Sequence, residues 1–259
     1  MTPIALTIAG SDPSGGAGIQ ADLKTFHQFG VYGEAVITLI TVQNTLRVSR
    51  VECLAPELVI QQAQAVLEDI RPRAAKTGAL GNRAIAEAVA RLAEGFDFPL
   101  VVDPVMISKH GAALIADDAR EAVKSSLLPR AYLLTPNLHE AAALAGMPVD
   151  NVDQMRAAAK VLCEMGACAV LVKGGHLAGS ATDVLYAEGE WHELSAPRIE
   201  TRHTHGTGCT YSAAITAALA KGVPLLDAAR SAKRFITQAI RTSPGLGSGA
   251  GPVNHHAPV

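Results

Sequence analysis

The sequence predicts an α/β protein whose central sheet is mainly parallel and is covered by helices on both faces. Short apolar runs typical of buried strands alternate along the chain with longer segments that have helical periodicity. Near residue 183 this alternation gives way to two short strand-like runs around Glu188-Gly189-Glu190, which indicates a hairpin. The composition, 49% hydrophobic and 18% charged, suits a well-buried core. These patterns predict one domain over residues 1–259, with a Gly/Pro/Ser-rich tail at about 243–259.

The strands of the sheet are expected where short apolar runs lie between turn signals, at 4–9, 35–42, 74–77, 100–102, 132–134 and 169–172. The helices are expected in the periodic segments between them, at 17–29, 56–70, 83–94, 117–127, 138–145 and 153–165. Pro56 and the glycines at 30, 95 and 166 are typical signals of helix starts and ends. The hairpin is expected at 183–187 and 191–194, and two final helices at 210–220 and 225–241. Because ligands bind at the carboxyl ends of parallel strands, the residues after each strand are the candidates for function.

Charge and cysteine content exclude several classes of protein. The net charge is −2 and basic residues are not clustered, so we expect no nucleic-acid partner. The spacings of the four cysteines do not resemble a disulfide framework or a zinc site, which favours a reducing cytoplasm. No apolar run approaches the roughly 18 residues of a membrane span, and the start of the chain is unlike a signal peptide. We therefore expect a cytoplasmic protein without membrane contact.

Polar or glycine-rich segments follow the first two predicted strands. The first is G-S-D-P-S-G-G-A-G at 10–18, whose glycines would let backbone amides approach a ligand or would simply form a tight turn. Asp22 lies about one turn into the next helix and faces either the same strand edge or solvent. Gln43 follows the second strand; its amide offers a donor and an acceptor together, which suits a heterocycle, or it caps its own loop.

Three later strands end in charged or amide side chains. Asp103 follows a buried strand and is a candidate for Mg²⁺ or its water shell, or for an Asx turn. Asn137 and Glu140 share one face at a helix start, which is typical of a capping box and also of an oxygen cluster near a hydrated cation. Lys173, followed by two glycines, suits a phosphate chain or a solvated turn.

The segment G-T-G-C at 206–209 gives the strongest single signal. Its glycines open a long helix, and the free N–H groups at that helix start form an anion site. The helix terminus would lower the pKa of Cys209. The thiol could then remove a proton from an alcohol during phosphoryl transfer, or act as the nucleophile of a Cys–His hydrolase with His176, His203 or His205. The alternative is a small buried side chain with no chemical role.

Several of these motifs together resemble the hydroxymethylpyrimidine/phosphomethylpyrimidine kinases of the ribokinase-like superfamily. The resemblance rests on G-S-D-P-S-G-G-A-G-I-Q-A-D-L-K-T at 10–25, T-P-N-L-H-E at 135–140, V-K-G-G-H at 172–176 and H-G-T-G-C-T at 205–210, together with the tail G-P-V-N-H-H. It implies a ribokinase-like three-layer α/β/α fold with a mostly parallel central sheet, and it implies assembly as a homodimer. It also implies two ATP-dependent phosphorylations in thiamine biosynthesis, first of 4-amino-5-hydroxymethyl-2-methylpyrimidine and then of its monophosphate.

The resemblance assigns roles to particular residues of this chain. It implies that Cys209 is the catalytic base and that the backbone of Gly206–Cys209, with Thr207 and Gly208 between them, forms the anion hole. On the substrate side it implies that the pyrimidine pocket is formed by Gln43, Asp22, Gly10, Val42 and Val105. On the nucleotide side it implies ATP contacts at Lys173, Asn137, Thr207 and Lys233, with Mg²⁺ near Glu140 and Asp103.

The chain departs from the family pattern at two positions. Ala79 stands where the family commonly has Met, and the smaller side chain would widen the pocket. Pyridoxal, which also carries a hydroxymethyl group on a six-membered nitrogen ring, is therefore the alternative substrate. His203 replaces an Asn in the loop before Gly206, where we expect a local effect only. A binding protein without catalysis is a further alternative, which the combination of Cys209, Glu140, Asn137 and Lys173 argues against.

Overall fold

The structure is a computed structural model that describes residues 2–106, 117–175, 177 and 179–259. The described residues form one nine-stranded sheet in the order β3-β2-β1-β4-β5-β6-β7-β8-β9. Its strands are β1 (Ile4–Ser11), β2 (Tyr32–Gln43), β3 (Val48–Cys53), β4 (Ala74–Thr77), β5 (Leu100–Val102), β6 (Leu133–Leu134), β7 (Ala169–Val172), β8 (Ala181–Ala187) and β9 (Glu190–Ala196). The six strands from β2 to β7 in this order are parallel, whereas β3 at one edge and the β8–β9 hairpin at the other are antiparallel.

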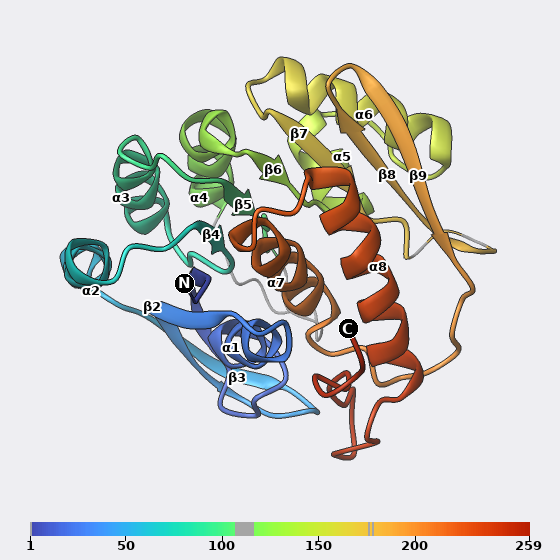
Figure 1. Ribbon diagram of the computed structural model, residues 1–259, viewed down its shortest axis with the longest axis horizontal. Coiled ribbons are helices and arrows are strands. Elements are labelled where there is room, and N and C mark those ends of the chain that lie inside the picture. The colour runs from blue at the N-terminus through green and yellow to red at the C-terminus, as the bar shows by residue number, and fades with distance from the viewer. Residues whose placement is uncertain (1, 107–116, 176, 178) are drawn as a thin grey trace.

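Helices cover both faces of this sheet, so the predicted three-layer α/β/α fold is confirmed (Figure 1). One face packs on α2 (Pro56–Asp69), α3 (Arg83–Ala93), α4 (Asp117–Ala122), α5 (Leu138–Ala145) and α6 (Val152–Glu164). The other face packs on α1 (Gly18–Gln28), α7 (Thr207–Ala220) and α8 (Leu225–Arg241). Neighbouring residues of β1 point into different layers, since Ala5 lies in the second core and Leu6 in the first. This two-sided burial explains why the strands are continuous apolar runs.

Helix α7 lies in the middle of its layer, in contact with α1, α8 and several strands. Every residue from Thr210 to Ala220 is buried. The segment is accordingly apolar all round, with small alanines that permit close packing on every side. The start of α7 is thereby held firmly at the carboxyl edge of the sheet.

Two predictions about local structure were wrong. β3 was not expected, because it is a polar edge strand that carries Arg50 and Glu52 and buries little apolar surface. The helix expected at 117–127 is the short α4, followed by a π-helical turn (Val123–Leu127) and a 3-10 turn (Leu128–Arg130). Pro129 lacks a backbone N–H, so a regular helix cannot continue through this segment.

The tail after α8 packs back onto the sheet edge, although it contains no regular helix or strand. The Thr45 carbonyl accepts a hydrogen bond from Ala250 N–H (2.9 Å), and Val253 is buried in the core on the α1, α7 and α8 side of the sheet. His205 pairs with the tail in both directions, because its N–H donates to the Gly251 carbonyl and its own carbonyl accepts from Val253 N–H. The tail therefore connects the loop after β2 to the loop before α7.

Candidate active site

The glycine-rich segment after β1 is organised around Asp12, a residue that the sequence did not single out. Its carboxylate accepts hydrogen bonds from the backbone N–H groups of Ser14 (2.9 Å), Gly16 (3.2 Å) and Ala17 (2.9 Å). Gly18, at the start of α1, has φ +56°, and a Cβ there would overlap the carbonyl oxygen of Gly10. The usable signal was the Asp-Pro-Ser-Gly pattern, because Asp often bonds the backbone that follows it.

Asp12 also connects this loop to the loop before α7. His205 Nε2 lies 2.7 Å from Asp12 Oδ2, and both side chains are almost fully buried. The His205 ring also lies 3.2 Å from the Gln43 amide nitrogen. The imidazole that stands nearest to Cys209 in sequence is therefore engaged with Asp12 and Gln43. His203 packs on Gly251 instead, and His176 lies outside the described residues.

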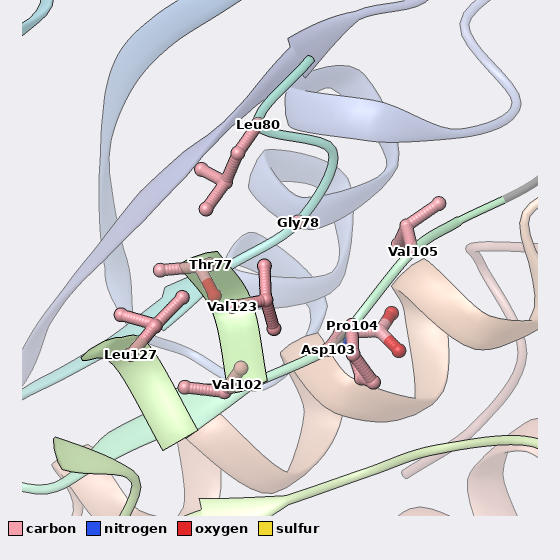
Figure 2. A pocket seen from close by; sticks show the side chains of 9 residues that line it. All are labelled: Thr77, Gly78, Leu80, Val102, Asp103, Pro104, Val105, Val123 and Leu127. Carbon is pink, nitrogen blue, oxygen red and sulfur yellow. The ribbon is translucent and has the colours of Figure 1, made fainter. Parts of the chain in front are cut away.

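The predicted pyrimidine-side residues occupy different environments. Gln43 ends β2 and is half-buried, and Val42 beside it is 54% exposed. Gly10 packs against Leu39, since a Cβ at Gly10 would lie 2.5 Å from that side chain. Val105 lines a cavity of about 10 Å³ with Asp103 and Thr77 (Figure 2). This cavity has room for about one water molecule, so the roles of Gly10, Val42 and Val105 as pocket walls stay predictions.

The ends of β5 and β7 are joined by an ion pair between Asp103 and Lys173. Lys173 Nζ donates to Asp103 Oδ1 (2.8 Å), while Ser212 from α7 donates to Oδ2 (3.2 Å). Burial alone would lower the pKa of Lys173, but the carboxylates of Asp103 and Glu140 raise it above its ordinary value. Lys173 is therefore a cation at this edge, as the prediction of a phosphate contact requires.

Asn137 and Glu140 form the capping box of α5. Asn137 Oδ1 accepts from Glu140 N–H (2.9 Å), and Glu140 Oε2 accepts from Asn137 N–H (2.8 Å). Burial raises the pKa of Glu140 to about 7, against the opposing effect of Lys173. The capping interpretation is thus confirmed. In the described part of the chain, no three His, Cys, Asp or Glu side chains gather as a preformed metal site.

The two glycine loops meet at the start of α7. Gly206 is the N-cap residue with φ 79°, and a Cβ there would overlap the carbonyl oxygen of Gly16. The Cα of Gly208 faces Lys173 and Asp103, since a Cβ there would lie 3.4 Å from Lys173 Nζ. Thr207 turns its hydroxyl back to the Thr204 carbonyl (2.7 Å). Glycine at 206 and 208 therefore allows close approach to this helix terminus.

The expected lowering of the Cys209 pKa was wrong for the protein without ligand. The residue as a whole is half-buried, but burial of its thiol raises the pKa to about 11. The positive charge of Lys76 opposes this rise, whereas the negative charges of Asp22 and Asp103 add to it. Desolvation thus outweighs the helix terminus, and the resting thiol carries its proton at neutral pH.

Two predicted residues are held in buried ion pairs. Asp22 is fully buried and accepts from Lys76 Nζ (2.7 Å) and from Thr7 Oγ1 (2.7 Å), so its direct contact with substrate stays a prediction. Lys233 on α8 donates to Asp183 Oδ2 (2.7 Å). Lys76 was missed because a single lysine in a four-residue strand gives no periodic signal.

The predicted grouping of side chains at one sheet edge is confirmed, since residues after β1, β2, β5 and β7 converge on the start of α7.

A solved structure of pyridoxal kinase from Bacillus subtilis, an ADP complex, matches with TM-score 0.91 and 40% identity, and the match covers 99% of this chain and 98% of that one. Phosphomethylpyrimidine kinase from Clostridium difficile 630 matches with TM-score 0.82 and 43% identity over 92% of this chain and 99% of that one. The fold is that of a ribokinase-like α/β protein.

The comparison of sequences places the chain more narrowly. The family model of phosphomethylpyrimidine kinase matches residues 12–254. The hydroxymethylpyrimidine/phosphomethylpyrimidine kinase of Bacillus subtilis is 47% identical over 256 residues, which are 98% of this chain and 94% of the relative. The chain belongs to the phosphomethylpyrimidine kinase family.

No helix among the described residues has the length and apolar character needed to cross a membrane.

Proposed function

We propose that this protein transfers the γ-phosphoryl group of ATP to 4-amino-5-hydroxymethyl-2-methylpyrimidine and then to the resulting monophosphate, in thiamine biosynthesis. Family membership and the names of the relatives support the substrate and the reaction. The observation that carries the chemistry is the start of α7, where Gly208 faces Lys173 and the Cys209 thiol interacts with the charge of Lys173. An anion site, a cation and a base are the groups that phosphoryl transfer to an alcohol requires.

Each group at the start of α7 has a definite task in this reaction. The N–H groups of residues 206–209 and the Lys173 ammonium bind the transferring phosphoryl group and stabilise its charge. Cys209, as thiolate, accepts the proton of the substrate hydroxyl while the oxygen–phosphorus bond forms. The bond from phosphorus to the ADP oxygen breaks at the same time, and its electron pair leaves with ADP. Asn137, Thr207 and Lys233 are the proposed contacts along the rest of the nucleotide.

Mg²⁺ is proposed to enter with ATP rather than to occupy a preformed cage. Magnesium in such sites usually keeps several waters and is held by one or two carboxylates together with the substrate phosphates. Glu140 and Asp103 are the two carboxylates near Lys173, and they fit this role through water. When bound, the ion would neutralise charge on the β- and γ-phosphates.

On the substrate side, Gln43 is the proposed hydrogen-bond partner of the aminopyrimidine edge. Its amide is already oriented by His205, which Asp12 holds in turn. Gly10, Val42 and Val105 are proposed as walls, and Asp22 as an acidic residue below the pocket.

Pyridoxal phosphorylation is a second candidate activity. The likeness to the Bacillus subtilis pyridoxal kinase structure favours it, as does Ala79, where a longer side chain would narrow the pocket. We also propose a homodimer, which the molecular mass in solution would test.

The decisive experiment measures ATP consumption with Mg²⁺ on hydroxymethylpyrimidine, its monophosphate and pyridoxal in parallel, with identification of each product. Turnover of both pyrimidines well above that of pyridoxal would support the proposal. Turnover of pyridoxal alone would instead support pyridoxal phosphorylation as the activity. No turnover of any of them, with pyrimidine still bound, would favour a binding protein. The variant Cys209→Ala should keep pyrimidine binding and lose about 10²–10⁴-fold in kcat; near-normal turnover would remove the thiol from the mechanism.

A further inference from the structure

An ion pair between Lys76 and Asp22 lies in the interior, behind the start of α7. Lys76 Nζ lies 2.7 Å from Asp22 Oδ1, and neither side chain has any solvent-exposed surface. Thr7, on the neighbouring strand β1, donates to the other carboxylate oxygen at 2.7 Å. Removing two charges from water is expensive, and hydrophobic side chains of similar size often stabilise a core as well or better. Such a pair therefore suggests a use beyond stability.

The position of this pair relative to Cys209 indicates what that use is. Lys76 lies in β4, the strand on which α7 packs, and its ammonium group is near enough to act electrostatically on the Cys209 thiol. Cys209 is therefore approached from β4 by a buried cation.

Three other charged groups besides Lys76 favour or oppose the thiolate form of Cys209. Lys173 is a second cation that interacts with Cys209, while Asp22 and Asp103 are two carboxylates that oppose a thiolate. Lys173 is bound to Asp103 and faces the edge where phosphate is expected. Lys76, in contrast, has no exposed surface and cannot reach ATP or substrate directly. Of the two cations, Lys76 is thus the one that acts on the thiol from the interior, while its ion pair with Asp22 fixes its position.

We propose that Lys76, held in place by Asp22 and Thr7, is a positioning residue that supplies the positive charge against which Cys209 becomes a thiolate. The proposal rests on the proposed role of Cys209 as the base. The thiol releases its proton to water before transfer, and the thiolate then takes up the proton of the substrate hydroxyl as the oxygen attacks phosphorus. A fixed ammonium beside the sulfur increases the fraction of thiolate without becoming a reactant itself.

The test measures the reactivity of Cys209 directly, apart from turnover. It uses the full chain with the other three cysteines replaced (Cys53→Ser, Cys163→Ser, Cys168→Ser), and iodoacetamide as the probe. Alkylation rates are followed from about pH 6 to pH 10, because altered access scales all rates alike whereas an altered pKa changes their dependence on pH. The variants are Lys76→Met and the double variant Asp22→Asn/Lys76→Met, in which no buried charge is left without its partner. Lys160→Met, an exposed lysine on α6, is the matched control.

The proposal expects Lys76→Met to slow alkylation at about pH 8 at least tenfold, which corresponds to one pKa unit, with the control unchanged. The double variant should slow alkylation less, because it also removes the opposing charge of Asp22. In turnover, kcat should fall by a similar factor and the rise of kcat with pH should move to higher pH, while KM for ATP stays constant. An unchanged alkylation profile in folded Lys76→Met would overturn the proposal, and so would a double variant that is alkylated faster than the wild type. If Cys209→Ala remains active, the proposed base fails, but the alkylation profile still decides whether Lys76 controls the thiol.

Discussion

Replacing Glu34 by glutamine should stabilise the protein above pH 7 and have little effect near pH 4.5. Glu34 lies on β2 and is only 5% exposed, and neither carboxylate oxygen has a hydrogen-bond partner among the described residues. Burial raises its pKa from 4.5 to about 7. The folded protein therefore binds this proton more tightly than the unfolded chain does. Folding is penalised progressively as the pH rises from 4.5, and the full penalty is present above 7.

The size of this penalty follows from the difference between the two pKa values. At about 1.4 kcal/mol per pH unit it reaches roughly 3 kcal/mol. Glu34 lies in the part of β2 that β3 does not cover, near the sheet edge, so solvent will reduce the penalty to about 1–2 kcal/mol. Urea denaturation of the wild type and of Glu34→Gln at about pH 4.5 and pH 8 measures it, with the exposed Glu68→Gln on α2 as control. A stability difference that is equal at both pH values would refute the argument.

Three further predictions concern the site. Gln43→Ala should raise KM for the pyrimidine about tenfold or more and leave KM for ATP unchanged, because the proposed ligand of this amide is the heterocycle and its protein partner is His205; an equal rise of both KM values would contradict this. Asp12→Asn should lower the free energy of unfolding by about 2–4 kcal/mol, since its carboxylate accepts from three backbone N–H groups and lies against His205; an unchanged thermal midpoint would show that the loops do not depend on it. Since burial raises the pKa of the Cys209 thiol to about 11, kcat/KM for the pyrimidine should rise nearly tenfold per pH unit from about pH 7 to pH 9. A flat profile there would exclude the thiol as the base.

The sheet and the location of the site could be predicted because both depend on local patterns. Apolar runs mark buried strands, and the rule that ligands bind at their carboxyl ends selects the residues that follow them. Lys173 and Asp103 were selected in this way and are in fact paired. Strand β3 was missed because an edge strand needs no apolar face, and its pairing with β2 is what defines it.

The partners of charged residues could not be predicted, because they lie far apart in sequence. Lys76 and Asp22 are separated by 54 residues, and Lys233 and Asp183 by 50. Neither pair leaves a periodic signal in either segment. The pKa of Cys209 was misjudged for the same reason, since the helix terminus is visible in the sequence but the burial of the thiol is not. Local sequence patterns thus locate the functional side chains, whereas their ionisation depends on burial and on partners that only the fold determines.

The packing of the tail has a consequence for the order in which the protein is made. Synthesis proceeds from the N-terminus, so Gly251 and Val253, which hydrogen-bond the backbone of His205, are translated after both glycine loops. The link from Asp12 to His205 spans 193 residues, and that from Gln28 to Ala257 spans 229. Contacts this distant form late in folding. A nascent chain can therefore complete its sheet before the tail contacts that hold the loop before α7 have formed.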